Sequence, residues 1–197
     1  MSVQGKKTKI VLDADVIIHF AKGGKLEMLP WILPEYQFMV LDVVKKEIPI
    51  LILSMLQKAI SQDKTIVEEV FGKSAGEMKE FARLISKDGP ALGRGESACM
   101  VYCLYRHDVV GSSNTKDVTA YCDEKGITYL TTSDFLYYAI QRGMMTKAEA
   151  DAFISEVRRM GSFTPLRSTM RLFLPDMLAA DVVDGEFQDQ GLGAVSP

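Results

Sequence analysis

Short apolar runs alternate with longer helix-like segments through the first 160 residues of the chain. Four runs have the length and apolar character of buried strands: Lys9–Leu12, Gln37–Leu41, Val109–Gly111 and Ile127–Leu130. A weaker alternating run, Thr65–Phe71, is typical of a strand at the edge of a sheet. Because neighbouring parallel strands are joined by a crossover, usually a helix, this order predicts an α/β fold. We expect a three-layer α/β/α sandwich with a mostly parallel central sheet.

Several of the helix-like segments carry recognisable end signals. Ser74 with Glu77, and Thr146 with Glu149, have the spacing of capping boxes. Pro49 lacks a backbone donor, so it is expected to break the apolar stretch around it into two helices. The predicted helices span residues 16–22, 26–33 (a short helix or turn), 43–57, 74–86, 96–106, 116–125, 135–141 and 146–160.

The regular alternation ends near Gly161. We therefore predict one domain over residues 1–160 and a C-terminal extension over residues 161–197. The extension has enough apolar residues up to Val183 to dock in part on another surface. Its polar, Gly-containing end is expected to be disordered.

Composition and charge narrow the class of protein. The net charge is −3, which counts against a protein that coats nucleic acid through bulk electrostatics. The three cysteines form no zinc-like pattern and are typical of reduced core cysteines. The N-terminus has no signal-peptide pattern, and the longest apolar run is too short to cross a bilayer. A cytoplasmic protein without membrane contact is the expectation.

Acidic residues stand at or near the ends of three predicted strands and at the start of one predicted helix. They are Asp13 and Asp15, Asp117 near Asn114, Asp134, and Glu96 in Gly-Arg-Gly-Glu. The carboxyl ends of parallel strands share one edge of a sheet, where ligands bind. Carboxylates gathered there repel one another, and a divalent cation relieves that repulsion. The pattern therefore indicates a metal site.

Each of these residues also has an ordinary structural interpretation. Asp15 and Asn114 are suited to capping the helices that follow them. Asp134 is suited to an ordinary position in the first turn of a helix. Glu96 would stabilise the dipole of its helix. Asp42 also ends a strand, and we interpret it as an N-cap.

Three of these motifs, in their order, resemble PIN-like domains, the fold of many toxin ribonucleases of toxin–antitoxin pairs. The segment Val11–Ile18 is similar to the opening of such domains, and Gly93–Ala98 to their Gly-x-x-Glu helix start. The segment Ser113–Asp117 is similar to their third motif. The resemblance covers roughly residues 8–160. It implies a nuclease that hydrolyses phosphodiester bonds, with RNA as the expected substrate.

The resemblance also implies roles for particular residues. The catalytic and metal-ligating residues would be Asp13, Glu96, Asp117 and Asp134, holding Mg²⁺ or Mn²⁺. From their nearness to this site in the sequence, we also predict four substrate-binding residues: Asn114, Lys116, Thr132 and Arg94. Local capping is the alternative for Thr132, and solvated surface charge is the alternative for Lys116 and Arg94. Asn114 departs from the family pattern, since many members have Asp there. The expected partners are an antitoxin-type protein or a second copy of the chain. The apolar segment Ile48–Leu56 exceeds what a surface helix needs, so we expect part of it to form this contact, with simple core burial as the alternative.

Two other functions compete with this one. The chain is alternatively a catalytically degenerate PIN-like module that binds a protein or nucleic acid. A third interpretation is an ordinary nucleotide-binding α/β domain. The first strand is followed by no Gly-x-Gly-x-x-Gly, and the chain contains no phosphate-loop motif, which disfavours this third interpretation.

Overall fold

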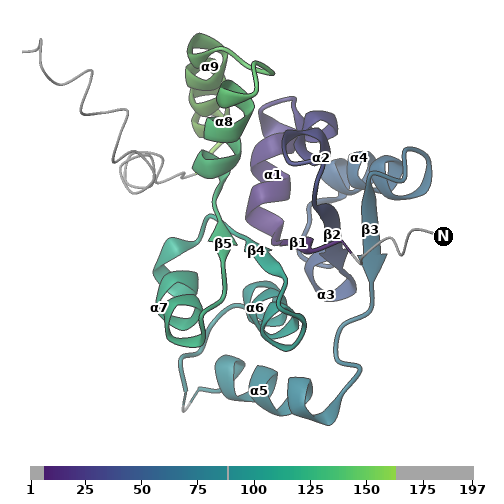
Figure 1. The fold of residues 1–197 in the computed structure, drawn as a ribbon, viewed down its shortest axis with the longest axis vertical. Helices are drawn as coiled ribbons and strands as arrows, with labels where there is room; N and C mark the ends of the chain where they lie inside the picture. The colour runs from purple at the N-terminus through teal and green to yellow at the C-terminus, as the bar shows by residue number, and fades with distance from the viewer. Residues whose placement is uncertain (1–6, 88, 163–197) are drawn as a thin grey trace, which may run out of the picture.

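In the part of the chain that the structure describes, a parallel sheet of five strands forms the centre (Figure 1). The computed structural model describes residues 7–87 and 89–162. The strand order is β3-β2-β1-β4-β5, and every neighbouring pair is parallel. The strands are β1 (Lys9–Leu12), β2 (Gln37–Leu41), β3 (Ile66–Glu69), β4 (Val109–Gly111) and β5 (Tyr129–Leu130). The predicted α/β class is confirmed, and the weak run near Ile66 is the edge strand β3.

Helices cover both faces of the sheet and complete the predicted three layers (Figure 1). One face carries the 3-10 turn η1 (Leu26–Met28) with α1 (Ala14–Lys22), α2 (Leu29–Ile32), α4 (Ile50–Ser61), α8 (Thr132–Gln141) and α9 (Lys147–Arg159). The other face carries α3 (Asp42–Lys45), α5 (Ala75–Ile85), α6 (Arg94–Arg106) and α7 (Thr115–Lys125). Because both faces are covered, the apolar residues of β1 and β2 are fully buried.

The helix signals in the sequence are confirmed with two corrections. Pro49 separates α3 from α4, as predicted. The capping box at the start of α9 is complete, but the one at α5 is half-formed. The Ser74 hydroxyl accepts from the Glu77 N–H, whereas the Glu77 carboxylate accepts from the backbone of Lys73. Asp42 is no N-cap, since it lies inside α3 and accepts a hydrogen bond from the backbone of Phe71.

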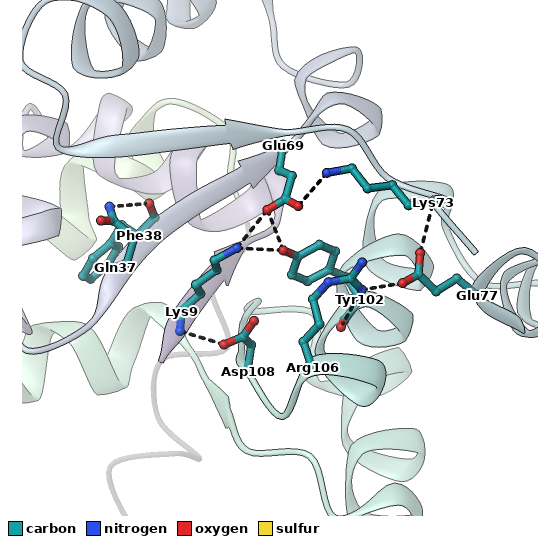
Figure 2. Close-up of polar contacts among 9 residues, drawn as sticks. All are labelled: Lys9, Gln37, Phe38, Glu69, Lys73, Glu77, Tyr102, Arg106 and Asp108. Carbon is teal, nitrogen blue, oxygen red and sulfur yellow. Dashed lines mark hydrogen bonds and ion pairs between the residues drawn. The ribbon is translucent and has the colours of Figure 1, made fainter. Parts of the chain in front are cut away.

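A polar network ties the sheet to α5 and the C-terminal half of α6 (Figure 2). The Lys9 ammonium donates to Glu69 and to the Tyr102 hydroxyl, at 2.8 and 2.9 Å. Tyr102 in turn donates to Glu69 at 2.6 Å. Beside it, the Arg106 guanidinium pairs with the buried Glu77 carboxylate at 2.5 Å. Both Glu69 and Glu77 therefore have a cationic partner.

The apolar segment Ile48–Leu56 divides between the core and the surface. Ile48 and Leu56 are buried, whereas Ile50 and Leu51 on α4 are 77% and 83% exposed. No helix in the part of the chain that the structure describes is both long and apolar enough to cross a membrane. The predicted docking and disorder of residues 163–197 lie outside the described residues.

Candidate functional site

Two neighbouring strands bring the first acidic pair together with a serine pair. Asp13 directly follows β1, and Ser112 and Ser113 directly follow β4, which pairs with β1. The Ser112 hydroxyl donates to Asp13 Oδ2 at 3.1 Å, and the backbone N–H of Ser113 donates to Asp15 Oδ2 at 2.7 Å. Asp13, rather than Asp15, is the N-cap of α1. The Asp15 carboxylate instead links the first turn of α1 to Ser113, just after β4.

Helix α6 brings a second acidic group to the same edge. Its first turn packs closely on the residues that follow β1 and α3: a Cβ at Gly95 would lie 3.1 Å from Asp13 Oδ1 and 2.5 Å from Glu47 Oε2. The Gly95 N–H donates to Glu47 Oε1 at 2.9 Å. Glycine at this position therefore lets Glu96 approach the strand-end carboxylates.

Asn114 joins the two remaining carboxylates of the cluster. It occupies the N-cap position of α7, as predicted, but its side chain makes no capping hydrogen bond. Instead its Nδ2 donates to Glu96 Oε1 and, at 3.0 Å, to Asp117 Oδ2. The structure thus gathers Asp13, Asp15, Glu96 and Asp117 around one edge. We call these four residues the acidic cluster.

Burial and mutual repulsion make ionisation of the cluster costly. Burial, followed by the charges of Asp15 and Glu96, raises the pKa of Asp13 well above its ordinary value. Burial also raises the pKa of Asp15 to about 6, although backbone hydrogen bonds oppose the shift. The pKa of Glu96 is raised by burial first, against the hydrogen bond from Asn114, and then by neighbouring carboxylates. The cluster is therefore strongly biased toward binding positive charge or protons.

No positively charged side chain in the described part of the protein neutralises these carboxylates. Among residues 7–87 and 89–162, no lysine, arginine or histidine nitrogen lies within 4.0 Å of a carboxylate oxygen of the acidic cluster. Glu96 Oε2 is buried without any hydrogen-bond partner. The same described residues contain no group of three Asp, Glu, His or Cys side chains already arranged to hold a metal ion. The donor set is nevertheless all oxygen, as a hard divalent cation prefers, and its orphaned oxygen fits such an ion.

An open pocket of about 450 Å³ lies against the cluster. Its wall includes Asp15, Glu96 and Asn114, and the exposed Lys116 lies at the same pocket. A larger molecule therefore has access to part of the cluster. A second hollow, of about 340 Å³, lies at the amino ends of the strands beside Asp108, away from the cluster.

Three predicted site residues have other partners. Asp134 forms a capping box with Thr131, whose N–H and hydroxyl both donate to its Oδ2 at 2.7 Å. The Thr132 hydroxyl bonds to Ser113 and His19 instead of facing the pocket. The Arg94 guanidinium lies over the Phe81 ring, 5.4 Å from its centroid. Helix α8 begins at Thr132, so Asp134 lies in its first turn. This position agrees with the ordinary structural interpretation of Asp134.

Three residues near the cluster are absent from the predicted site residues. The position of Asp15 predicts a helix cap, although its spacing from Asp13 is also a signal of a shared site. His19 is one of only two histidines and lies one helical turn after Asp15, which was also a signal. Glu47 follows a short helix with no motif around it, so nothing in the sequence indicated that Gly95 would contact it.

Comparison with known proteins shows remote similarity to solved structures. No family model and no curated protein matches the chain. Among solved structures, a PilT N-terminus domain protein from the hyperthermophilic archaeon Sulfolobus solfataricus P2 superposes with a TM-score of 0.38 and 12% sequence identity. The match covers 66% of this chain and 92% of that one. A similarity this remote assigns no role to any residue, so the site is interpreted from its own side chains.

Proposed function

We propose that this protein is a PIN-like ribonuclease that uses Mg²⁺ or Mn²⁺ to hydrolyse phosphodiester bonds. The observation that supports this most is the acidic cluster itself. Four carboxylates from three separate segments meet at the edge of a parallel sheet, where ligands bind. The pKa values of three of them are raised, and one oxygen of Glu96 lacks any partner. A bound divalent cation would relieve both features.

The cation would be held by Asp13 and Glu96, with Asp15 and Asp117 close by. When bound, it would supply an activated water and neutralise charge on the phosphate. The chain's own residues set up the site around it. The Ser112 hydroxyl fixes Asp13, and the Asn114 amide holds Glu96 and Asp117 in place. Asp134 has no part in this account, because its hydrogen bonds serve the cap of α8.

Cleavage of single-stranded RNA in millimolar MnCl₂ tests this proposal. We expect Asp13→Asn and Glu96→Gln each to reduce the rate constant at least about a hundredfold, because a bound metal contributes several kcal/mol to catalysis. Asp42→Asn is the matched control. Asp42 also follows a strand, but its carboxylate accepts from the backbone of Phe71 outside the cluster. Equal cleavage by all four proteins would contradict the proposal.

A second candidate function is a catalytically degenerate PIN-like module that binds a protein or nucleic acid. Asn114 supports it, because the amide already occupies one oxygen of each of two carboxylates and adds no negative charge. A thermal shift with MnCl₂ separates the two. The nuclease predicts stabilisation that disappears in Asp13→Asn, whereas a degenerate module predicts none in either protein.

An antitoxin-type partner or a second copy of the chain belongs to the same proposal. Ile50 and Leu51 on α4 support it, since they are large apolar side chains that are mostly exposed. We expect Leu51→Lys to abolish self-association in analytical ultracentrifugation while leaving the melting temperature of the protein unchanged. A wild-type chain that is monomeric at all concentrations would remove the second copy as the partner.

A further inference from the structure

His19 lies in the wall of the pocket beside the acidic cluster, which we call the acidic pocket. It has no role in the function proposed above. It is on α1, one turn after Asp15, and only 4% of its surface is exposed. Its Nδ1 lies 2.9 Å from the Thr132 hydroxyl. No described residue forms a hydrogen bond with its Nε2, although the side chain lines the pocket. The Nε2 edge of the ring is therefore the part available to a ligand.

A chain of hydrogen bonds favours the proton on one particular ring nitrogen. The backbone N–H of Thr132 donates to Ser113 Oγ at 2.9 Å, and the Ser113 hydroxyl donates to Thr132 Oγ1 at 2.7 Å. Thr132 Oγ1 accepts that bond, so its own proton is free to donate to His19 Nδ1. An Nδ1 that accepts belongs to the neutral tautomer with its proton on Nε2.

We propose that His19 is a substrate-binding residue that donates its Nε2–H to a non-bridging oxygen of the substrate phosphodiester. Ser113 and Thr132 are then positioning residues, because they act on the substrate only through the orientation and tautomer of this ring. The proposal rests on the proposed function, since it takes the occupant of the pocket to be a phosphodiester.

The surroundings of His19 suit a neutral donor better than a charged one. Burial, assisted by the positive charge of Lys22, lowers the pKa of His19 to about 4. The ring is therefore neutral at physiological pH and adds no positive charge beside a bound cation. Asp15 and Glu96 on the same wall would repel an anionic phosphate, and a fixed N–H donor compensates for part of that repulsion. Lys116 is exposed at the same pocket and provides the charged contact.

Nuclear magnetic resonance of protein labelled with ¹⁵N-histidine reads the tautomer directly. The chain has two histidines, so His107 serves as an internal control at the other end of α6. We expect His19 to show the neutral Nε2–H tautomer between pH 6 and 8 (roughly the range in which an ordinary histidine loses its charge). On addition of a short single-stranded RNA with CaCl₂, the Nε2 signal of His19 should shift while that of His107 stays unchanged. The Nδ1–H tautomer, or an Nε2 signal that ignores the RNA, would overturn the proposal.

Two substitutions separate hydrogen-bond donation from simple packing. In His19→Gln the amide N–H takes the approximate place of Nε2–H, whereas in His19→Asn the amide reaches only the position of Nδ1. A hydrogen bond to a charged group predicts a KM raised about tenfold or more in His19→Asn, with kcat less affected. We expect His19→Gln to stay within about threefold of wild type, and His107→Gln to match it. Equal losses in the Asn and Gln variants would show that the ring only fills space, and the proposal would fail.

The two readouts also separate this inference from the ribonuclease proposal. Cleavage by wild type without an RNA-dependent shift at His19 would refute only the role of His19. A shift at His19 without any cleavage would refute only the nuclease and leave a phosphodiester-binding pocket. If neither is observed, both proposals fail.

Discussion

Helix α6 carries a polar cluster at each end, and the two differ in how their charges are balanced. At its C-terminal half, Tyr102 and Arg106 belong to a network in which Glu69 and Glu77 each have a cation (Figure 2). At its first turn, Glu96 belongs to the acidic cluster, whose carboxylates have no cationic partner in the described chain. We call the first network closed, because each of its acidic residues has a cationic partner. The acidic cluster is open in this sense, because its carboxylates have none.

The pKa shifts have opposite signs at the two ends. Although burial opposes it, hydrogen bonds from two lysines and from Tyr102 lower the pKa of Glu69 to about 2. Burial raises the pKa of Asp15 to about 6 at the other end. The first cluster stabilises its own carboxylates, so it needs no ligand. The second does not, and that difference is what marks it as a candidate binding site rather than a structural network.

The largest expected effect is at the closed network. Glu77 is 3% exposed and pairs with Arg106, so Glu77→Gln leaves a guanidinium without its buried partner. We expect the free energy of unfolding to fall by about 3–5 kcal/mol, measured by urea denaturation. Glu156→Gln is the control, because its pair with Arg159 on α9 is exposed and should contribute nothing measurable. A Glu77→Gln variant as stable as the control would show that the network is not a source of stability.

The next effect is a dependence of stability on pH without metal. The pKa of Asp15 is higher in the folded state, about 6 against an ordinary value of 3.8, so the folded state binds more protons between these values. The contribution of Asp15 to stability is therefore largest below about pH 4 and falls by up to about 3 kcal/mol as the pH rises to 6. The contribution of Glu69 has the opposite sign and is lost only as the pH falls toward 2.

Urea denaturation in EDTA between pH 4 and 7 measures this dependence. We expect Asp15→Leu, which cannot ionise at this position, to show a smaller decline between pH 4 and 6 than wild type, because Asp13 and Glu96 still contribute to it. Added MnCl₂ should counteract the decline, since metal binding requires ionised carboxylates. A wild-type protein that gains stability over this range in EDTA would contradict the assigned charge balance.

A smaller effect of opposite sign to that of Glu77→Gln is expected for Asp13→Asn. Asparagine keeps the acceptor for the Ala14 N–H and meets the rotatable Ser112 hydroxyl with its amide. Removal of an uncompensated buried charge should therefore raise the free energy of unfolding in EDTA at pH 7 by about 1–3 kcal/mol. Asp15→Asn should gain less, because both Asp15 oxygens accept backbone N–H groups and one would face an amide N–H instead. Destabilisation by Asp13→Asn would mean that the charge is already compensated in the folded protein.

The fold could be predicted from the sequence because its signals are local. Apolar runs marked the strands, Pro49 marked the break between α3 and α4, and the weak run near Ile66 marked the edge strand. Strand β5 begins later than predicted, at Tyr129. Helix α8 begins earlier than predicted, because Thr131 and Asp134 form a capping box at its start. A cap and a strand-end ligand have the same residue types, so the sequence alone did not separate them.

The candidate site was only partly predictable, because it depends on contacts between distant segments. Asp13, Glu96 and Asp117 meet as expected from the shared edge of the sheet. The position of Asn114 was expected, but its bridging of two carboxylates depends on how closely α6 approaches α7. The contact between Gly95 and Glu47 likewise depends on the packing of α3 against α6. Such distances are set by the core and have no local signature.

A crystal of the protein soaked in MnCl₂, with the anomalous signal of manganese recorded, tests the central claim most directly. The account predicts a peak between the carboxylates of Asp13 and Glu96, and no peak there in crystals of Asp13→Asn. An empty cluster in the wild-type crystal, with its carboxylates unmoved and manganese bound elsewhere or not at all, would contradict it.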